Sequence, residues 1–396
     1  MLLLQFFYPE YISSATLPFD TASKLVKEGF TVDVLCGYPH EYTNDDRVPR
    51  KETVNGIHIK RVKYWHLDKK KALGRIVNFL SLTVSMAFRL FSMRKYKTIV
   101  VYSNPPVLPL VAAMASKLFK CKLVFVAYDL YPEVALRTNS LSEGGMVTKL
   151  MNFVNKSVYQ RANAVVALSS EMKDFIVQNR KIDADKVHVI SNWYEDAYQP
   201  EQKKADNRFA SLVNDRLVVG YFGNMGVAQD MEPVKEAIKH YKDDPEVCFL
   251  LSGHGSKHAD IEKMIADENI ENAYLYGFLQ GQDYLDALSI SDCAIVSLEK
   301  GLTGLSVPSK TYGYMMQGIP VVAIMDESDI VNDVKQGAGY HIPENSSDKL
   351  IELIGKLKKN PTDCKEKGIK CREIYCEKYT PQICLERYVT LLNKLK

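Results

Sequence analysis

The sequence predicts an α/β protein with two doubly wound parallel sheets, one following the other along the chain. Its 396 residues are enough for about two ordinary domains. Short apolar runs alternate with longer helical stretches, and this alternation occurs twice, as expected when helices cover both faces of a parallel sheet. The polar segment 192–207 separates the two series. A composition of 46% hydrophobic and 25% charged residues excludes disordered and collagen-like chains.

The first series contains short, mostly apolar runs that are typical of buried strands. We expect these strands at residues 2–7, 31–36, 98–102, 122–127, 164–168 and 188–190. The stretches between them have helical periodicity, and we expect helices at 17–28, 76–93, 108–119, 148–161 and 170–179. This series predicts an N-terminal domain over residues 1–200.

The second series repeats the pattern and predicts a domain over residues 201–379. Its strands are expected at 217–222, 247–252, 273–276, 294–297, 320–324 and 339–342, and its helices at 231–241, 259–267, 284–291, 310–317 and 348–358. A last helix, at 380–396, is not needed to cover this second sheet. Two such sheets that face each other through the carboxyl ends of their strands would form a cleft in which ligands bind.

The chain has no run of about 18 apolar residues, so no membrane-spanning helix is expected. The apolar start has no basic lead and no small-residue cleavage site, so it reads as a strand and not as a signal peptide. We therefore expect a cytoplasmic protein.

The charge is close to balanced overall, at +3, but unevenly distributed, with +9 over residues 1–200 and −6 over 201–396. Segment 60–97 holds eleven Lys or Arg and one acid, Asp68, around the uncharged stretch 76–88. A basic, apolar and amphipathic segment predicts peripheral contact with an anionic membrane surface. The alternative is a core helix with a solvated basic rim. Nucleic acid is not expected as a partner, because the segment lacks interleaved stacking aromatics.

No metal is expected. Four of the eight cysteines lie in strand-like runs, and the spacing of the others fits no zinc pattern; these others are Cys364, Cys371, Cys376 and Cys384. The pair Asp183 and Asp185 precedes a strand, whereas a metal-binding Asp-x-Asp follows one. His254 and His258 are spaced to share a helical face, but a third ligand is missing nearby.

Two glycine-containing loops follow the first two strands of the second series. Gly223, Asn224 and Gly226 come after the strand at 217–222, where glycines let a backbone approach a phosphate and a helix N-terminus attracts its charge. Gly253 follows the next strand in a Gly-His-Gly run. A tight strand–helix turn explains the first loop equally well and is the favoured interpretation of the second, and neither loop completes a dinucleotide fingerprint.

The strongest signal is the glycine-containing loop at 301–308, which leads into a helix that starts with Ser309 and Lys310. Free N–H groups, a hydroxyl and an ammonium at one helix start make an anion site. A solvated lysine is the alternative, but a cation is unfavourable at a helix N-terminus, and a bound anion would remove that conflict.

Asp129 and Glu133 follow a strand of the first domain in the run Tyr-Asp-Leu-Tyr-Pro-Glu. Two acids beside aromatics at this edge suggest contact with sugar hydroxyls or proton transfer. A helix N-cap at Asp129 is the structural alternative. Small residues such as Ser14, after the first strand, can also lie close to a ligand.

Taken together, these motifs resemble the GT-B glycosyltransferases of the large retaining family four, and more narrowly the bacterial sugar transferases of capsule and O-antigen assembly. The resemblance covers nearly the whole chain. It is carried by residues 8–10, 27–32, 55–62, 103–106, 129–133, 189–193, 221–226, 308–310 and 318–322.

The resemblance implies that the N-terminal domain holds the acceptor, that the C-terminal domain holds a nucleotide-sugar, and that the last helix returns to the N-terminal domain. It implies a front-side substitution without a protein nucleophile, in which the enzyme stabilises charge on the leaving diphosphate. The implied diphosphate contacts are Ser309, Lys310 and backbone N–H groups near Gly223–Gly226 and near Leu305, Ser306 and Val307.

Other positions match or depart from the family pattern. Phe278 and Leu279 match its nucleobase wall, and Asp129 and Glu133 would contact acceptor or donor sugar. Relatives often carry two glutamates at the positions of Leu305 and Gly313 in this chain. In those relatives, the glutamate at the second position usually holds the ribose. Many relatives also place an Arg and a Lys on the donor diphosphate, at the positions of Asn224 and Gln229 in this chain. A histidine that lies near the 6-hydroxyl of the donor sugar in relatives is replaced here by Tyr128.

The resemblance thus implies transfer of an N-acetylhexosamine, or its 6-deoxy form, from a UDP-sugar to an undecaprenyl-type, lipid-diphosphate-linked sugar. It implies no cofactor and a place on the inner face of the cell membrane. A nucleotide-sugar 2-epimerase and a non-catalytic partner protein with the same fold are the alternatives, because several expected donor contacts are replaced.

Overall fold

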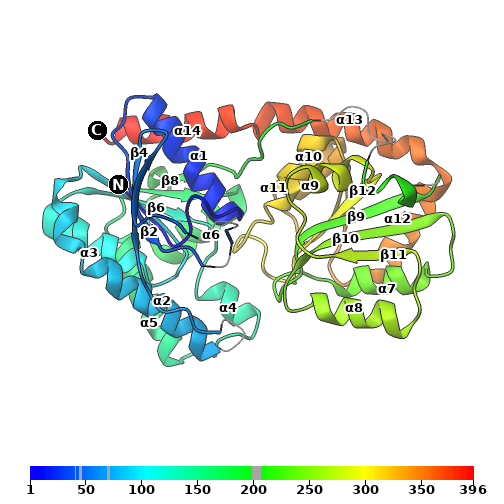
Figure 1. Ribbon diagram of the computed structural model, residues 1–396, viewed down its shortest axis with the longest axis horizontal. Coiled ribbons are helices and arrows are strands. Elements are labelled where there is room, and N and C mark those ends of the chain that lie inside the picture. Colours follow the sequence, from blue (N-terminus) through cyan, green and yellow to red (C-terminus); the bar gives the residue numbers. More distant parts are fainter. Residues whose placement is uncertain (41, 44–46, 69–71, 199–206, 214) are drawn as a thin grey trace. The chain divides into compact units, whose positions relative to one another are not determined.

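The computed structural model describes residues 1–40, 42–43, 47–68, 72–198, 207–213 and 215–396 (Figure 1). The chain forms two compact α/β units. The first comprises Met1–Asn192, Gly304–Val307 and Gln382–Lys396, and the second comprises Trp193–Thr303 and Pro308–Pro381. The first unit therefore ends before residue 200, and the short segment Gly304–Val307, predicted in the second domain, groups with the first.

The first unit has an eight-stranded sheet in the order β3-β4-β2-β1-β5-β6-β7-β8. Its strands are β1 (Leu2–Leu3), β2 (Asp33–Gly37), β3 (Lys51–Val54), β4 (Ile57–Val62), β5 (Thr98–Tyr102), β6 (Lys122–Ala127), β7 (Ala164–Ala167) and β8 (Val187–Val189). All neighbours are parallel except β3 and β4. That hairpin was not predicted, although its turn residues Asn55 and Gly56 both have positive φ, as an Asn-Gly hairpin turn requires.

The first strand is shorter than predicted. Only Leu2–Leu3 pair regularly, and the chain beyond them keeps single backbone contacts to β2, such as Gly37 N to Gln5 O at 2.9 Å. Its apolar side chains are buried without being part of a strand, because burial alone does not require regular strand pairing.

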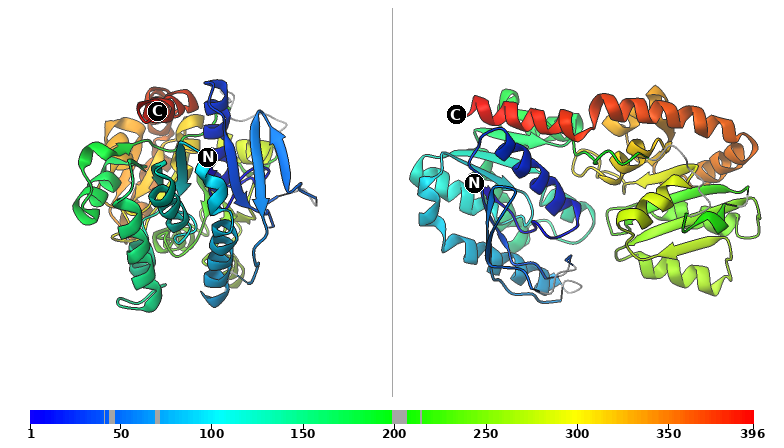
Figure 2. Two further views of the ribbon diagram at one scale, coloured as in Figure 1. Left: turned by 90° about the vertical axis from the view of Figure 1, so that its left-hand side faces the viewer. Right: turned by 45° about the horizontal axis from the view of Figure 1, so that its top comes forward.

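Helices cover both faces of the first sheet. They are α1 (Ser13–Lys27), α2 (Ala72–Ala87), α3 (Pro109–Phe119), α4 (Glu133–Arg137), α5 (Met146–Tyr159), α6 (Ser170–Arg180) and α14 (Pro381–Lys394). The expected helix at 76–93 ends earlier, and a 3₁₀ helix at Leu90–Lys95 follows it. Lys24 of α1 pairs with Glu386 of α14 at 3.3 Å, which places the last helix against the first unit (Figure 2).

The second unit has a six-stranded, fully parallel sheet in the order β11-β10-β9-β12-β13-β14. Its strands are β9 (Leu217–Asn224), β10 (Val247–His254), β11 (Ala273–Tyr276), β12 (Cys293–Ser297), β13 (Val321–Ile324) and β14 (Gly339–Ile342). The helices are α7 (Glu232–His240), α8 (His258–Asp267), α9 (Gly281–Ser289), α10 (Lys310–Gln317), α11 (Asp329–Asp333), α12 (Ser347–Lys359) and α13 (Pro361–Lys378). The predicted strands and the helix at 310–317 are confirmed within a few residues.

Helix α13 was missed by the sequence analysis because it is highly charged and its apolar periodicity is weak. It packs closely on α10 all the same. A Cβ atom at Gly368 would lie 2.4 Å from the carbonyl oxygen of Gly318, so a glycine is needed for this approach. In the described part of the chain, no helix combines the length and apolar character that crossing a membrane requires.

Candidate active site

The side chain of Lys310 lies across the carboxyl end of β9. A Cβ atom on Gly223 would be 3.3 Å from Lys310 Cε, so the glycine leaves the room that the lysine stem occupies. The Lys310 ammonium donates to the carbonyl oxygen of Asn224 at 3.3 Å and lies 3.6 Å from the ring centroid of Tyr221. The sequence prediction that Lys310 and this loop belong to one site agrees with these contacts.

The charge of Lys310 is not balanced by an acid. Within the described ranges, no carboxylate lies within salt-bridge distance of its Nζ atom. Burial holds the pKa of Lys310 well below its usual value, because a desolvated ammonium loses hydration that a carbonyl and a ring replace only in part. Ser309 beside it is the N-cap of α10, but its side chain makes no capping hydrogen bond. The site therefore offers a cation and a hydroxyl to an anion.

Two backbone N–H groups of the β9 loop are already used within the protein. Met225 N donates to His254 O at 2.7 Å, and Gly226 N donates to Gln229 Oε1 at 3.0 Å. Of the N–H groups near Gly223–Gly226 that were predicted to face a phosphate, those of Met225 and Gly226 are bonded within the protein instead. Gln229, which stands where relatives carry a cation, holds the loop in shape.

Gly253 and its neighbour Gly255 are required by packing. A Cβ atom at Gly253 would lie 1.8 Å from Gly223 O, and one at Gly255 would lie 2.5 Å from the Met225 backbone. Close packing in a tight strand–helix turn thus accounts for both glycines. A donor contact at Gly253 stays a prediction.

Lys257 holds the loop after β9 in place through hydrogen bonds that the sequence did not indicate. Lys257 Nζ donates to Gln229 O and to Glu299 Oε1, each at 2.6 Å. Glu299 N also donates to Ala228 O at 2.9 Å. These contacts join the loops after β9, β10 and β12, and no local sequence pattern indicates a contact between residues so far apart.

Phe278 and Leu279 follow β11 at the same edge of the sheet. The Phe278 ring is 41% exposed and meets the His254 ring edge-on at 5.5 Å. Leu279 N donates to Ser252 Oγ at 3.1 Å. His254 ends a strand while His258 begins α8, so the expectation that the two share a helical face is wrong. Burial, with His258 and Lys310 nearby, lowers the pKa of His254.

In the first unit, Asp129 contacts the segment 304–307. Ser306 Oγ donates to Asp129 Oδ1 at 2.5 Å, and Leu130 N donates to Leu305 O at 2.9 Å. Burial raises the pKa of the Asp129 carboxyl, and the bond from Ser306 offsets part of that rise. Leu305 is buried, so its side chain is not available to a ligand. The predicted residues Asp129, Leu305, Ser306 and Val307 are thus brought together.

Glu133 has a partner that the sequence did not indicate. Arg180 Nη2 lies 2.5 Å from Glu133 Oε2, with only 11% and 23% of the two side chains exposed. This ion pair fixes α4 to α6, and a sugar contact at Glu133 stays a prediction. Ser14 lies in the first turn of α1 and is half-buried.

No group of three or more His, Cys, Asp or Glu suited to a metal ion occurs among the residues the structure describes. Cys364, Cys371 and Cys384 are buried and Cys376 is exposed. The Cys371 thiol donates to Ile319 O, so it packs as a core residue.

The basic segment 60–97 carries exposed apolar side chains in the first unit; residues 69–71 within it lie outside the described ranges. Helix α2 buries Leu82 and Met86, yet other apolar residues of the segment are 40–84% exposed: Trp65, Leu67, Leu73, Leu80, Val84, Phe88 and Phe91. Helix α3 packs against both α2 and α5. Helices α3 and α5 carry further exposed apolar residues: Met114, Leu118, Met146, Leu150 and Phe153. One side of α2 therefore packs into the core, and another side exposes apolar residues.

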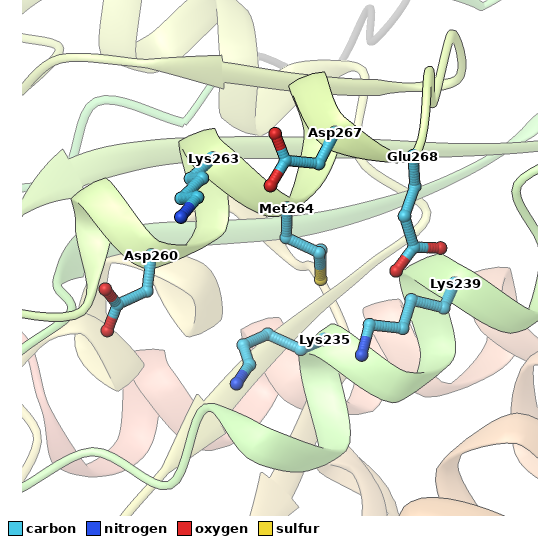
Figure 3. A pocket seen from close by; sticks show the side chains of 7 residues that line it. All are labelled: Lys235, Lys239, Asp260, Lys263, Met264, Asp267 and Glu268. Carbon is cyan, nitrogen blue, oxygen red and sulfur yellow. The ribbon is translucent and has the colours of Figure 1, made fainter.

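A groove lined mainly by charged side chains lies between α7 and α8 of the second unit (Figure 3). It is lined by Lys235, Lys239, Asp260, Lys263, Met264, Asp267 and Glu268. Charges of both signs alternate there, and Lys239 is paired with Glu236 at 2.9 Å. It does not include the loops that follow the strands.

Two family models together match most of the chain. The model described as "Glycosyl transferase 4-like domain" matches residues 19–193, and "Glycosyl transferases group 1" matches residues 203–373. The chain is a GT-B glycosyltransferase of family four. Both the recognition of the family and the predicted fold class are confirmed.

Curated relatives of this glycosyltransferase carry names of the same class. "Probable glycosyltransferase WbjE" of Pseudomonas aeruginosa is 24% identical over 74% of this chain and 73% of that protein. "Putative colanic acid biosynthesis glycosyl transferase WcaI" of Escherichia coli K12 is 26% identical over 62% of each chain. The poly(ribitol-phosphate) α-N-acetylglucosaminyltransferase of Staphylococcus aureus is 25% identical over 59% of this chain and 44% of that protein.

Solved structures share the fold of this glycosyltransferase. Sucrose-phosphate synthase of Thermosynechococcus elongatus superposes with a TM-score of 0.78 at 15% identity, covering 100% of this chain and 99% of that one. Anabaena HepE in complex with UDP-glucose gives 0.74 at 16% identity, with 100% of both chains covered. A transferase activity is favoured over the 2-epimerase and the non-catalytic partner by the family and by the named relatives.

Proposed function

We propose that this glycosyltransferase transfers an N-acetylhexosamine, or its 6-deoxy form, from a UDP-sugar to a lipid-diphosphate-linked sugar in capsule or O-antigen synthesis. The observation that carries the proposal is the unbalanced Lys310 ammonium at the carboxyl end of β9. A diphosphate supplies the negative charge that this cation lacks, and charge-assisted hydrogen bonds to phosphate are strong.

A site that stabilises negative charge on a diphosphate favours a reaction in which the diphosphate is the leaving group. The acceptor hydroxyl oxygen bonds to the anomeric carbon as the bond from that carbon to the diphosphate oxygen breaks, on the same face of the sugar. Attack on that face retains the configuration without a protein nucleophile, and the acceptor proton passes to the leaving diphosphate. Lys310 and the Ser309 hydroxyl stabilise the charge that develops on the diphosphate. No metal is required for this role.

The choice of nucleotide and sugar is supported by the relatives. HepE binds UDP and UDP-glucose in structures of the same fold, and the staphylococcal relative is named for α-N-acetylglucosamine transfer. WcaI is named for colanic acid biosynthesis. The exposed Phe278 ring offers a flat apolar face for a nucleobase. Tyr128, in place of a histidine, suits a donor without a 6-hydroxyl.

The acceptor and the location are proposed from the surface of the first unit. Exposed side chains such as Phe88 and Phe91 belong to a segment that also carries the exposed Arg75, Arg89 and Arg94. Apolar side chains enter the headgroup region while arginines pair with anionic lipids. A peripheral enzyme on the inner face of the cell membrane can reach an undecaprenyl-type lipid-linked acceptor from this surface.

The direct test is nucleotide binding followed by transfer. Thermal shift with UDP, GDP, ADP and CDP should give a clear stabilisation with UDP; at a hundredfold over Kd the gain is about 2.7 kcal/mol. Transfer from UDP-N-acetylglucosamine and from a 6-deoxy UDP-N-acetylhexosamine to a lipid-diphosphate-linked sugar would then be compared by mass spectrometry. Stabilisation by another nucleotide alone would contradict the proposed donor.

A further inference from the structure

Tyr284 of α9 places its hydroxyl against Gly313 of α10. A Cβ atom at Gly313 would lie 2.7 Å from the Tyr284 hydroxyl oxygen, which is closer than real side chains tolerate. The hydroxyl therefore occupies the space that any side chain at position 313 would fill. Gly313 is buried inside a helix, where glycine is otherwise unfavourable, so its small size needs a reason.

The ring of Tyr284 is held firmly while its hydroxyl is left without a partner. Its centroid lies 6.0 Å from that of Phe222 and 5.9 Å from that of Tyr194. In the part of the chain that the structure describes, no group hydrogen-bonds to the Tyr284 hydroxyl. Tyr314, by contrast, accepts from Phe222 N at 2.8 Å and donates to Phe222 O at 3.1 Å. The Tyr284 hydroxyl is not one of the buried polar atoms that lack a partner, so it can be reached from outside the fold and can bond to a ligand.

The hydroxyl lies on the same side of α10 as Lys310. Positions 310 and 313 are neighbours on a helix surface. The same two elements also meet consecutive residues of β9: the Tyr284 ring packs on Phe222, and the Lys310 stem lies across Gly223. Tyr284 and Lys310 therefore both lie at the carboxyl end of β9, where a diphosphate at Lys310 would be followed by its adjoining sugar ring.

We infer that the Tyr284 hydroxyl hydrogen-bonds a ribose hydroxyl of the donor nucleotide and that Gly313 is glycine to make room for it. The inference rests on the proposed nucleotide-sugar donor. The ribose is favoured over the transferred sugar because α9 follows directly after the exposed Phe278. A base on Phe278 and a diphosphate at Lys310 leave the ribose between them. Burial raises the pKa of Tyr284 well above its usual value, so the neutral hydroxyl can donate.

The test compares UDP with 2′,3′-dideoxy-UDP by calorimetry on three variants of the full chain. Tyr284→Phe should weaken UDP binding about two- to tenfold, the range of one neutral hydrogen bond, and should abolish the preference for UDP over the dideoxy nucleotide. Gly313→Ala should do the same, because its methyl group displaces the hydroxyl. Tyr276→Phe, whose ring packs on Phe209 in the same unit, should bind like the wild type.

Three results would overturn the inference. An unchanged ribose preference in folded Tyr284→Phe removes the contact. Loss of affinity for the UDP-sugar with unchanged UDP affinity assigns the hydroxyl to the transferred sugar instead. A wild type that binds both nucleotides equally has no ribose contact to assign, whereas a wild type that binds no nucleoside diphosphate contradicts the proposed donor itself. Unchanged melting temperatures of the variants show that folding is not the cause.

Discussion

The charge of Lys310 can be removed while its packing is kept, by the substitution Lys310→Met. The methionine stem still fills the space over Gly223, but the ammonium is gone. Charged hydrogen bonds contribute about 1.5–3 kcal/mol, so UDP should bind about 10- to 150-fold more weakly. Catalytic turnover should fall further, because the charge on the diphosphate grows in the transition state.

Stability separates this effect from damage to the fold. Among the described residues, the ammonium contacts a carbonyl and a ring and no carboxylate, and its desolvation is unfavourable. Lys310→Met should therefore change the free energy of unfolding by less than about 1 kcal/mol in either direction. Lys263→Met, on the exposed face of α8 (Figure 3), is the matched control and should bind UDP normally.

The pH dependence gives a second readout. The folded pKa of Lys310 lies below the unfolded value of 10.5, so between the two values the unfolded chain holds more protons and stability rises with pH. UDP binding needs the protonated form and should weaken as pH rises through the lowered pKa. Calorimetry across pH should show both trends in the wild type and neither in Lys310→Met. A folded Met variant that binds UDP within about twofold of the wild type would refute the reasoning.

Three further substitutions test other parts of the structure. Glu133→Gln leaves Arg180 as a largely buried, unpaired charge and should cost about 3 kcal/mol by urea denaturation; adding Arg180→Met should recover most of it, and no recovery would contradict the pairing. Phe91→Glu should reduce sedimentation with anionic vesicles severalfold, whereas Ile369→Glu, at an exposed position of α13, should not; equal effects would remove the membrane argument. Gly223→Ala, at φ +127° and against the Lys310 stem, should destabilise by about 1–3 kcal/mol and weaken UDP binding, and a neutral result by both measurements would show that the glycine is dispensable.

The sequence determined the architecture because its signals are local. Alternating apolar runs and helical periodicity fixed two parallel sheets, and the helix predicted at 310–317 is α10. Lys310 was identified because a cation at a helix start is unfavourable without an anion, which is an argument from neighbouring residues alone. The hairpin of β3 and β4 also had a local signal, the Asn-Gly turn, but it was not used.

Tertiary structure decided which of the predicted residues are free to act. Glu133 is a candidate acid in the sequence, and only the folded chain shows that it is paired with Arg180, far along the chain. The N–H of Gly226 reads as a phosphate ligand, yet the Gln229 side chain already accepts from it. Tyr284 has no sequence signal, and its importance comes only from the space at Gly313. Pairing, burial and close approach join residues that are distant in sequence, so only the folded chain shows which charges and hydroxyls are left for a ligand.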